Sequence, residues 1–121
     1  IETGSYVNKS LESVKQEIEA KNIVPVFIGN GDKIIKQYPS NGTVMNANDK
    51  LFLLTNGTEI KYTNIEGWSR NDLSVYSNLL GVTFNYLGYG YAKETSVTDR
   101  VVVKGETIDI NLAPKYTISS F

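Results

Sequence analysis

The fold is decided by the stretch Ile34–Leu54, which reads IIKQYPSNGTVMNANDKLFLL. Its extended start meets Pro39, whose ring restricts φ and removes an N–H, and Gly42 follows, which can take a positive φ. A proline inside a turn with a glycine at its end is typical of a chain reversal. A second cluster of turn residues precedes Leu51–Leu54, an apolar run of strand length. We therefore predict two strands joined by a long turn.

The residues before this pair predict a helix and a further strand. Ser10 stands ahead of an apolar stripe with the i, i+3, i+7 spacing of a helix face, formed by Leu11, Val14 and Ile18. We expect an amphipathic helix of about three turns with Ser10 as its N-cap. Residues 23–28, IVPVFI, are rich in β-branched and aromatic side chains and predict a strand, which Pro25 restricts to an edge or a bulged position.

The second half of the chain repeats this order of elements. Ser69 precedes a second helical stripe, Leu73, Tyr76 and Leu80, and Gly81 is suited to end that helix. An offset of 59 residues carries Ser10 onto Ser69 and Phe27 onto Tyr86. We predict an α+β fold of two small repeats, each with one helix packed on a three-stranded β-sheet. The expected boundaries are 1–57 for the first repeat, 58–114 for the second and 115–121 for a C-terminal tail.

Each repeat is expected to bury one helix face against its own sheet. The first core is predicted to contain Leu11, Val14, Ile18, Phe27, Ile35 and Leu53, and the second Leu73, Leu80, Val82, Phe84, Ile108 and Ile110. Tyr86 is expected to lie in the second core as well, on the strand face that it shares with Phe84.

The connection between the repeats contains Asn56-Gly57, which has two interpretations. An Asn-Gly pair between extended runs is the strongest short signal for a hairpin, in which residues 60–62 fold back beside Leu51–Leu54 and the repeats pack compactly. A turn-rich surface connection is also what a flexible hinge looks like.

Composition excludes several kinds of chemistry. The chain has 121 residues, a formal net charge of −1, and neither cysteine nor histidine. It therefore lacks thiolate and imidazole metal ligands and the usual nucleophile–base pairs, and its charge gives no broad attraction to nucleic acid. No apolar run approaches the ~20 residues of a membrane span. We expect no metal, no cofactor, no nucleic-acid partner and no membrane span in this sequence.

Several motifs in the chain resemble the PASTA module, a small extracytoplasmic repeat of penicillin-binding proteins and bacterial serine/threonine kinases. In the first repeat, residues 35–43, IKQYPSNGT, look like the family's Val-x-x-Gln-x-Pro-x-x-Gly-Thr. In the second repeat, residues 65–69, IEGWS, look like Leu-x-Gly-x-Ser, and residues 101–108 look like Val-x-x-Gly-x-x-Val. The second repeat departs from the pattern because it reads Thr95-Ser96-Val97 where the family has Gln and Pro.

The resemblance implies a binding module of the cell wall rather than an enzyme. It favours the C-terminal pair of a class B penicillin-binding protein, the division transpeptidase of a Gram-positive bacterium, over a kinase sensor. The implied role is weak binding of uncrosslinked peptidoglycan or muropeptides and positioning of the attached transpeptidase domain, with division proteins, at the septum. The alternative is a purely structural or protein-interaction module. No Ser-x-x-Lys motif of an acylating domain occurs in the chain, so no catalytic residue is assigned.

The candidate ligand-binding residues lie in the second repeat. Trp68, Arg70, Tyr89 and Tyr91 are expected to bind the glycan and its acidic stem peptides, since aromatic rings stack on sugar faces and arginine pairs with carboxylates. Trp68 also has the position of a residue that only packs the helix start. The other basic residues of this repeat, Lys93, Arg100 and Lys104, are expected to be mostly solvated charges.

Overall fold

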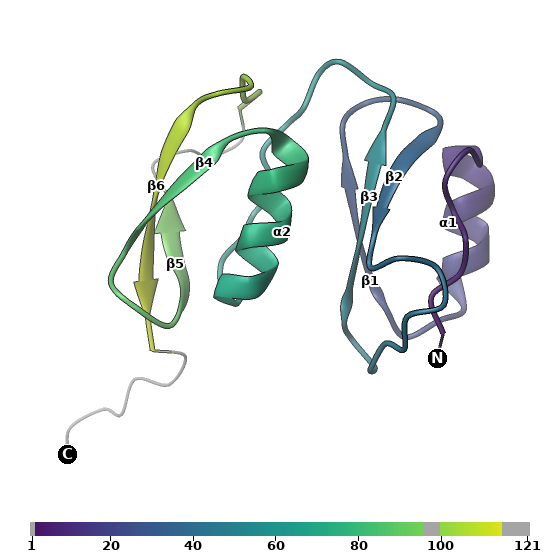
Figure 1. The fold of residues 1–121 in the computed structure, drawn as a ribbon, viewed down its shortest axis with the longest axis horizontal. Coiled ribbons are helices and arrows are strands. Elements are labelled where there is room, and N and C mark those ends of the chain that lie inside the picture. The colour runs from purple at the N-terminus through teal and green to yellow at the C-terminus, as the bar shows by residue number, and fades with distance from the viewer. Residues whose placement is uncertain (1, 96–99, 115–121) are drawn as a thin grey trace. The chain divides into compact units, whose positions relative to one another are not determined.

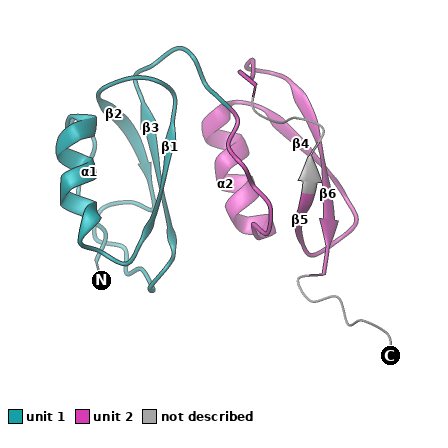
Figure 2. Cartoon of the chain, turned by 180° about the vertical axis from the view of Figure 1, so that it is seen from behind, with its two compact units in different colours: residues 1–61 teal, residues 62–121 magenta. Residues whose placement is uncertain are grey.

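The computed structural model describes residues 2–95 and 100–114 and shows an α+β fold (Figure 1). The chain divides into two compact units, residues 1–61 and residues 62 onward (Figure 2). Each unit has one helix and one three-stranded sheet, which confirms the predicted fold class. The elements of unit 1 are α1 (Leu11–Glu19), β1 (Val24–Ile28), β2 (Ile34–Tyr38) and β3 (Lys50–Thr55). Those of unit 2 are α2 (Arg70–Leu80), β4 (Thr83–Leu87), β5 (Tyr91–Thr95) and β6 (Thr107–Ala113).

The two sheets have the same topology. The strand orders are β1-β3-β2 and β4-β6-β5, so the last strand of each unit lies in the middle. The central strand pairs parallel with the first strand of its unit and antiparallel with the second. Pro25 therefore lies on an edge strand, as its missing N–H predicts.

Side-chain and glycine caps set the helix ends. Ser10 Oγ accepts a hydrogen bond from Ser13 N–H at 3.2 Å, and Ser69 Oγ accepts one from Asp72 N–H at 3.2 Å. Both serines are extended N-caps, as predicted. Gly81 ends α2 in the left-handed conformation with φ 76°, where a side chain would be strained.

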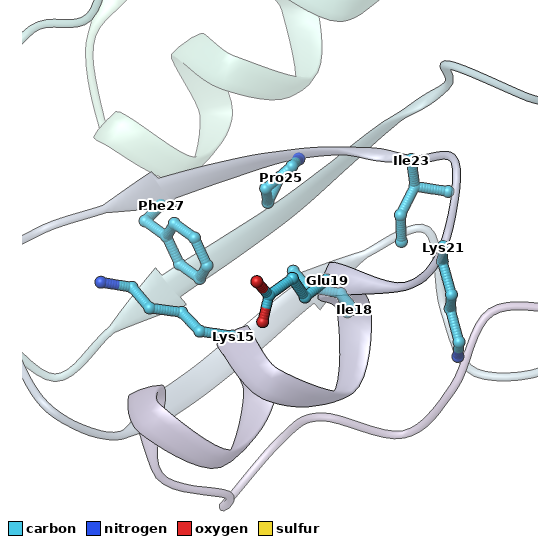
Figure 3. Close-up of a pocket in the computed structure, with 7 residues that line it drawn as sticks. All are labelled: Lys15, Ile18, Glu19, Lys21, Ile23, Pro25 and Phe27. Atoms are coloured by element: carbon cyan, nitrogen blue, oxygen red, sulfur yellow. The ribbon is translucent and has the colours of Figure 1, made fainter.

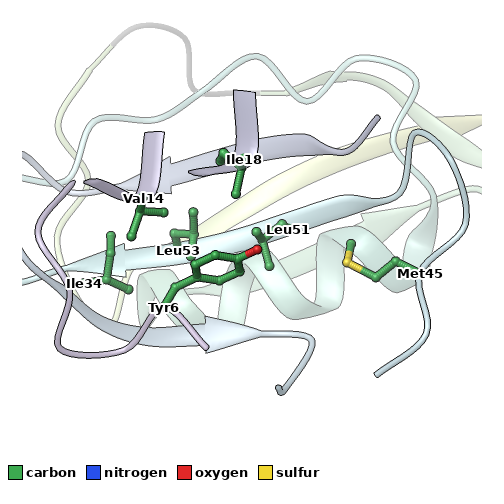
Figure 4. Close-up of a cluster of buried hydrophobic side chains, with 7 residues drawn as sticks. All are labelled: Tyr6, Val14, Ile18, Ile34, Met45, Leu51 and Leu53. Atoms are coloured by element: carbon green, nitrogen blue, oxygen red, sulfur yellow. The ribbon is translucent and has the colours of Figure 1, made fainter. Parts of the chain in front are cut away.

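The core of unit 1 lies between α1 and its sheet, and it corrects one predicted residue (Figure 4). Ile34 is fully buried, whereas Ile35, which was expected in the core, is 44% exposed. Successive strand residues point to opposite faces, so only one of two adjacent isoleucines can face the helix. Leu11 and Phe27 pack against this cluster while partly buried. The cluster contains Tyr6, Val14, Ile18, Ile34, Met45, Leu51 and Leu53, of which Tyr6 and Met45 were not predicted.

The core of unit 2 agrees with the prediction except at Tyr86, which is half-buried. All six expected residues, Leu73, Leu80, Val82, Phe84, Ile108 and Ile110, are buried. Tyr62 and Tyr76 add a cluster of aromatic rings, with centroids 5.9 Å apart and each 6.3 Å from the ring of Phe84. Burial raises the pKa of the Tyr76 hydroxyl to about 12, although this oxygen accepts a hydrogen bond from Thr63 N–H at 2.9 Å.

The expected hairpin at Asn56-Gly57 does not form. Strand β3 is already paired on both sides, and Tyr62 N–H instead donates to the carbonyl of Arg100 at 2.9 Å. Asn56 Oδ1 accepts hydrogen bonds from the backbone of Asp32 and Lys33, at 3.1 and 3.3 Å. A side chain on Gly57 would collide with the loop between β1 and β2. Asn56-Gly57 therefore holds that loop.

Candidate functional site

The predicted site residues in unit 2 begin at the start of α2. Trp68 directly precedes the N-cap and is half-buried, with its ring edge-on to Tyr76 at a centroid distance of 5.1 Å. Its carbonyl accepts a hydrogen bond from Ala92 N–H at 2.9 Å, which ties the helix start to β5. Trp68 thus packs the helix start while the residue stays half-buried.

Arg70, the first residue of α2, lies over an aromatic ring. Its guanidinium carbon is 3.6 Å from the centroid of Tyr86 on β4, the distance of a close cation–π stack. The helix begins here because Ser69 caps it, and that start places the arginine above the edge strand. The stacked arginine is exposed, so its planar group can still meet a ligand.

The placement of Tyr86 corrects its assignment to the core. The residue is half-buried rather than buried, with its ring edge-on to Phe84 at 6.3 Å and Arg70 above it. Because Tyr86 ends the core stripe of β4 near the sheet edge, one of its faces is left for the arginine. A possible signal was the polar hydroxyl at a position where the first repeat has Phe27.

Tyr89 lies in the turn between β4 and β5, and Tyr91 follows that turn directly. Gly88 and Gly90 take φ values of 92° and 106°, a conformation that suits glycine, and Tyr89 between them is 75% exposed. Tyr91 begins β5 and is half-buried. The turn therefore contributes one exposed ring, that of Tyr89, and the start of β5 contributes a half-buried one.

Arg100 is committed to an ion pair. Its guanidinium donates to both carboxylate oxygens of Glu106, at 3.2 and 2.6 Å. This hydrogen bonding lowers the pKa of Glu106 and raises that of Arg100. Lys93 and Lys104 are exposed, as expected for solvated charges. Arg70 is thus the arginine that the described part of unit 2 offers to a ligand.

The described residues show neither a metal site nor a membrane span. Within residues 2–95 and 100–114, no three acidic side chains gather to hold a metal ion. In the same part of the chain, neither helix has the length and apolar character needed to cross a bilayer.

Comparisons with known proteins identify a domain in the first half of the chain. The model of the PASTA domain matches residues 1–57, and a comparison with curated proteins finds no match. The crystal structure of penicillin binding protein 2X from Streptococcus thermophilus matches with a TM-score of 0.80 and 22% identity. The match covers 93% of this chain but only 17% of that one, and at this identity it shows a shared fold.

Two kinase structures from Staphylococcus aureus are more distant. The extracellular region of the Ser/Thr kinase PrkC matches at 19% identity and a TM-score of 0.37, covering 93% of this chain and 46% of that one. A three-PASTA-domain structure of a Ser/Thr kinase matches at 18% identity and a TM-score of 0.37, covering 92% and 66%. Neither TM-score supports a statement about shared architecture.

The sequence motifs, the fold and the comparisons agree on the family. Unit 1 carries the matched residues, and unit 2 repeats its element order and strand pairing. Residues 1–57 therefore match the PASTA domain, and the second unit has the same topology.

Proposed function

We propose that the chain is a non-catalytic, extracytoplasmic module of a penicillin-binding protein that weakly binds uncrosslinked peptidoglycan or muropeptides. The ligand-binding residues are Trp68, Arg70, Tyr89 and Tyr91, with Tyr86 as the ring beneath Arg70. The observation that carries the proposal is the exposed guanidinium held 3.6 Å above the Tyr86 ring.

The chemistry of this surface suits a glycan that bears acidic peptides. Exposed aromatic faces, above all that of Tyr89, can stack on the C–H faces of sugar rings. Stacking on Tyr86 holds the guanidinium of Arg70 in place, so that forming two parallel hydrogen bonds to a stem-peptide carboxylate costs little extra ordering. Binding is weak because one arginine and a net charge of −1 supply little attraction to an acidic polymer.

The role in the cell follows from this binding. A module that recognises uncrosslinked wall helps to position an attached transpeptidase domain, together with division proteins, at the septum. The fold shared with penicillin binding protein 2X supports this parent.

Co-sedimentation with purified cell-wall sacculi tests the proposal. The double variant Arg70→Ala, Tyr89→Ala should lower the bound fraction several-fold, since it removes the cation and the most exposed ring. The control, Lys36→Ala with Tyr38→Ala, removes an exposed cation and an exposed tyrosine from β2 of unit 1 and should bind like the wild type. Equal retention of wild type and Arg70/Tyr89 variant would contradict this site, and no retention of the wild type would favour a structural or protein-interaction module.

A further inference from the structure

A groove in unit 1 lies outside the site proposed above. It runs between α1 and the edge strand β1, has a volume of about 420 Å³ and is open to solvent (Figure 3). Its floor is apolar, and the charged side chains of α1 and of the turn after it form the rim. The floor consists of Ile18, Ile23, Pro25 and Phe27.

The charges on the rim of this α1–β1 groove are not neutralised by one another. The ammonium of Lys15 lies 5.4 Å from the centroid of the Phe27 ring, and within the described residues neither Lys15 nor Glu19 takes part in an ion pair. Lys21 also lines the groove (Figure 3), but its ammonium donates to the hydroxyl of Tyr6 at 3.3 Å. Lys15 is thus the cation that a ligand in the groove would meet.

The strand beside the groove can accept a further extended chain. Because β1 pairs with β3 on one side only, its other edge is unpaired within unit 1. Val24 N–H donates to the carbonyl of Asp49, and in a parallel ladder the backbone groups of alternate residues, Pro25 and Phe27, then point outward. Since proline has no N–H, this edge offers one donor and its carbonyls, enough for a short contact but not for a long ladder.

We propose that the α1–β1 groove binds an extended segment of a partner protein, which lays an apolar side chain on Pro25 and Phe27 and pairs a neighbouring carboxylate with Lys15. The open groove favours a peptide over a small molecule, because a small ligand needs a cleft that encloses most of its surface. The carboxylate follows from the unpaired ammonium at one end, while Glu19, one helical turn away, repels a second acidic group there.

Unit 2 lacks this combination and serves as an internal reference. The offset of 59 residues replaces Lys15 by Ser74 and Glu19 by Asn78, and the cation of this helix face is instead Arg70, which already stacks on the Tyr86 ring. Phe84 replaces Pro25 and is itself buried, which fills the floor. The proposed peptide should therefore select unit 1, whereas the glycan site lies in unit 2.

Amide chemical shifts of the full chain, titrated with a blocked peptide, test the proposal. The probe is acetyl-Gly-Ser-Glu-Phe-Ser-Gly-amide, compared with versions in which lysine replaces the glutamate or alanine the phenylalanine. The probe should shift the amides of Lys15, Ile23 and Phe27 at lower peptide concentration than those of Ser74 and Asn78. Both altered peptides should bind more weakly. No shift at the groove at millimolar peptide would overturn the proposal.

Two variants test the charge without touching the core. Lys15→Glu changes an exposed helix position and should lower the affinity for the glutamate peptide about fivefold, since an exposed attraction becomes a repulsion. For the lysine peptide the same change turns a repulsion into an attraction and should raise the affinity. Lys36→Glu makes the same charge change on exposed β2 and should alter neither affinity. If both variants bind the two peptides with the wild-type preference, Lys15 does not recognise a carboxylate and the proposal is wrong.

Discussion

Two adjacent isoleucines at the start of β2 differ greatly in how much of their surface is exposed to solvent. Ile34 has none of its surface exposed and contributes to the core with Val14 and Leu53, whereas Ile35 keeps 44% of its surface in solvent. The pairing with β3 also shifts between Ile34 and Lys36, which marks a bulge at this point. Chemically identical side chains thus have very different roles.

Alanine substitutions should separate these two residues. Ile34→Ala leaves a cavity and should lower the free energy of unfolding of unit 1 by about 2–4 kcal/mol, while Ile35→Ala should cost no more than about 0.5 kcal/mol. Native-state hydrogen exchange at the amide of Leu53, on the central strand, measures both. Equal costs would mean that the burial of β2 is misassigned.

At the scale of elements, the short segment just ahead of β6, residues 100–106, hydrogen-bonds to other parts of unit 2. Glu106 accepts hydrogen bonds from Arg100 and from Val103 N–H at 2.6 Å, and its carbonyl accepts one from Thr83 N–H at 2.9 Å. The carbonyl of Arg100 accepts a hydrogen bond from Tyr62 N–H. One carboxylate therefore stabilises the turn that joins the entry of unit 2, β4 and β6.

The stability of this turn should depend on pH. Because the pKa of Glu106 is lowered in the folded state, chiefly by Arg100, its contribution is present in full above the ordinary glutamate value of about 4.3 and is lost as the pH falls through the lowered value. Glu106→Gln should therefore reduce Tm at neutral pH, and the difference from the wild type should shrink in acid.

Trp68, the single tryptophan, lies in unit 2 and reports its unfolding by fluorescence. The control is Glu66→Gln, a charge change at an exposed residue of the same unit, which should leave the pH dependence of Tm as in the wild type. A Tm difference between Glu106→Gln and wild type that stays constant with pH would show that the ion pair does not hold the turn.

At the scale of the whole molecule, the chain is a repeat whose halves have diverged unequally. Val24 corresponds to Thr83, an offset of 59 residues, while Lys50 corresponds to Thr107, an offset of 57, so two residues are lost between the first and the central strand. Both antiparallel pairs nevertheless keep a register shift at the corresponding place, Ile34/Lys36 and Ala92/Glu94. The topology tolerates the loss because it falls in connections, while the strand pairing is kept.

The chain as a whole should not react covalently with penicillin. A serine becomes a stable acylated nucleophile only beside a base that activates it, and the sequence has neither histidine nor a Ser-x-x-Lys motif. Incubation with a fluorescent penicillin followed by a denaturing gel should show no labelled band, next to an intact penicillin-binding protein as the positive control. A band that survives denaturation would refute a non-catalytic role.

Much of the fold could be predicted from the sequence because the signals are local. Serine caps act on amides two or three residues away, so Ser10 and Ser69 mark helix starts without any knowledge of the partners. The helical and strand periodicities likewise identify the faces that bury Val14 and Leu73. The glycine and proline positions of the first repeat suffice to indicate the family.

Only the tertiary structure decided which distant groups meet. Asn56-Gly57 has the local pattern of a hairpin, but β3 already has a strand on each side, so the pair contacts the loop between β1 and β2 instead. Arg70 covers Tyr86, and Lys15 approaches Phe27, because helix and strand pack at a particular offset that neither segment encodes alone. The sequence by itself thus determined the elements and their buried faces, since these depend on neighbours along the chain. The two candidate surfaces could not be determined in this way, since they depend on contacts between residues far apart in the sequence.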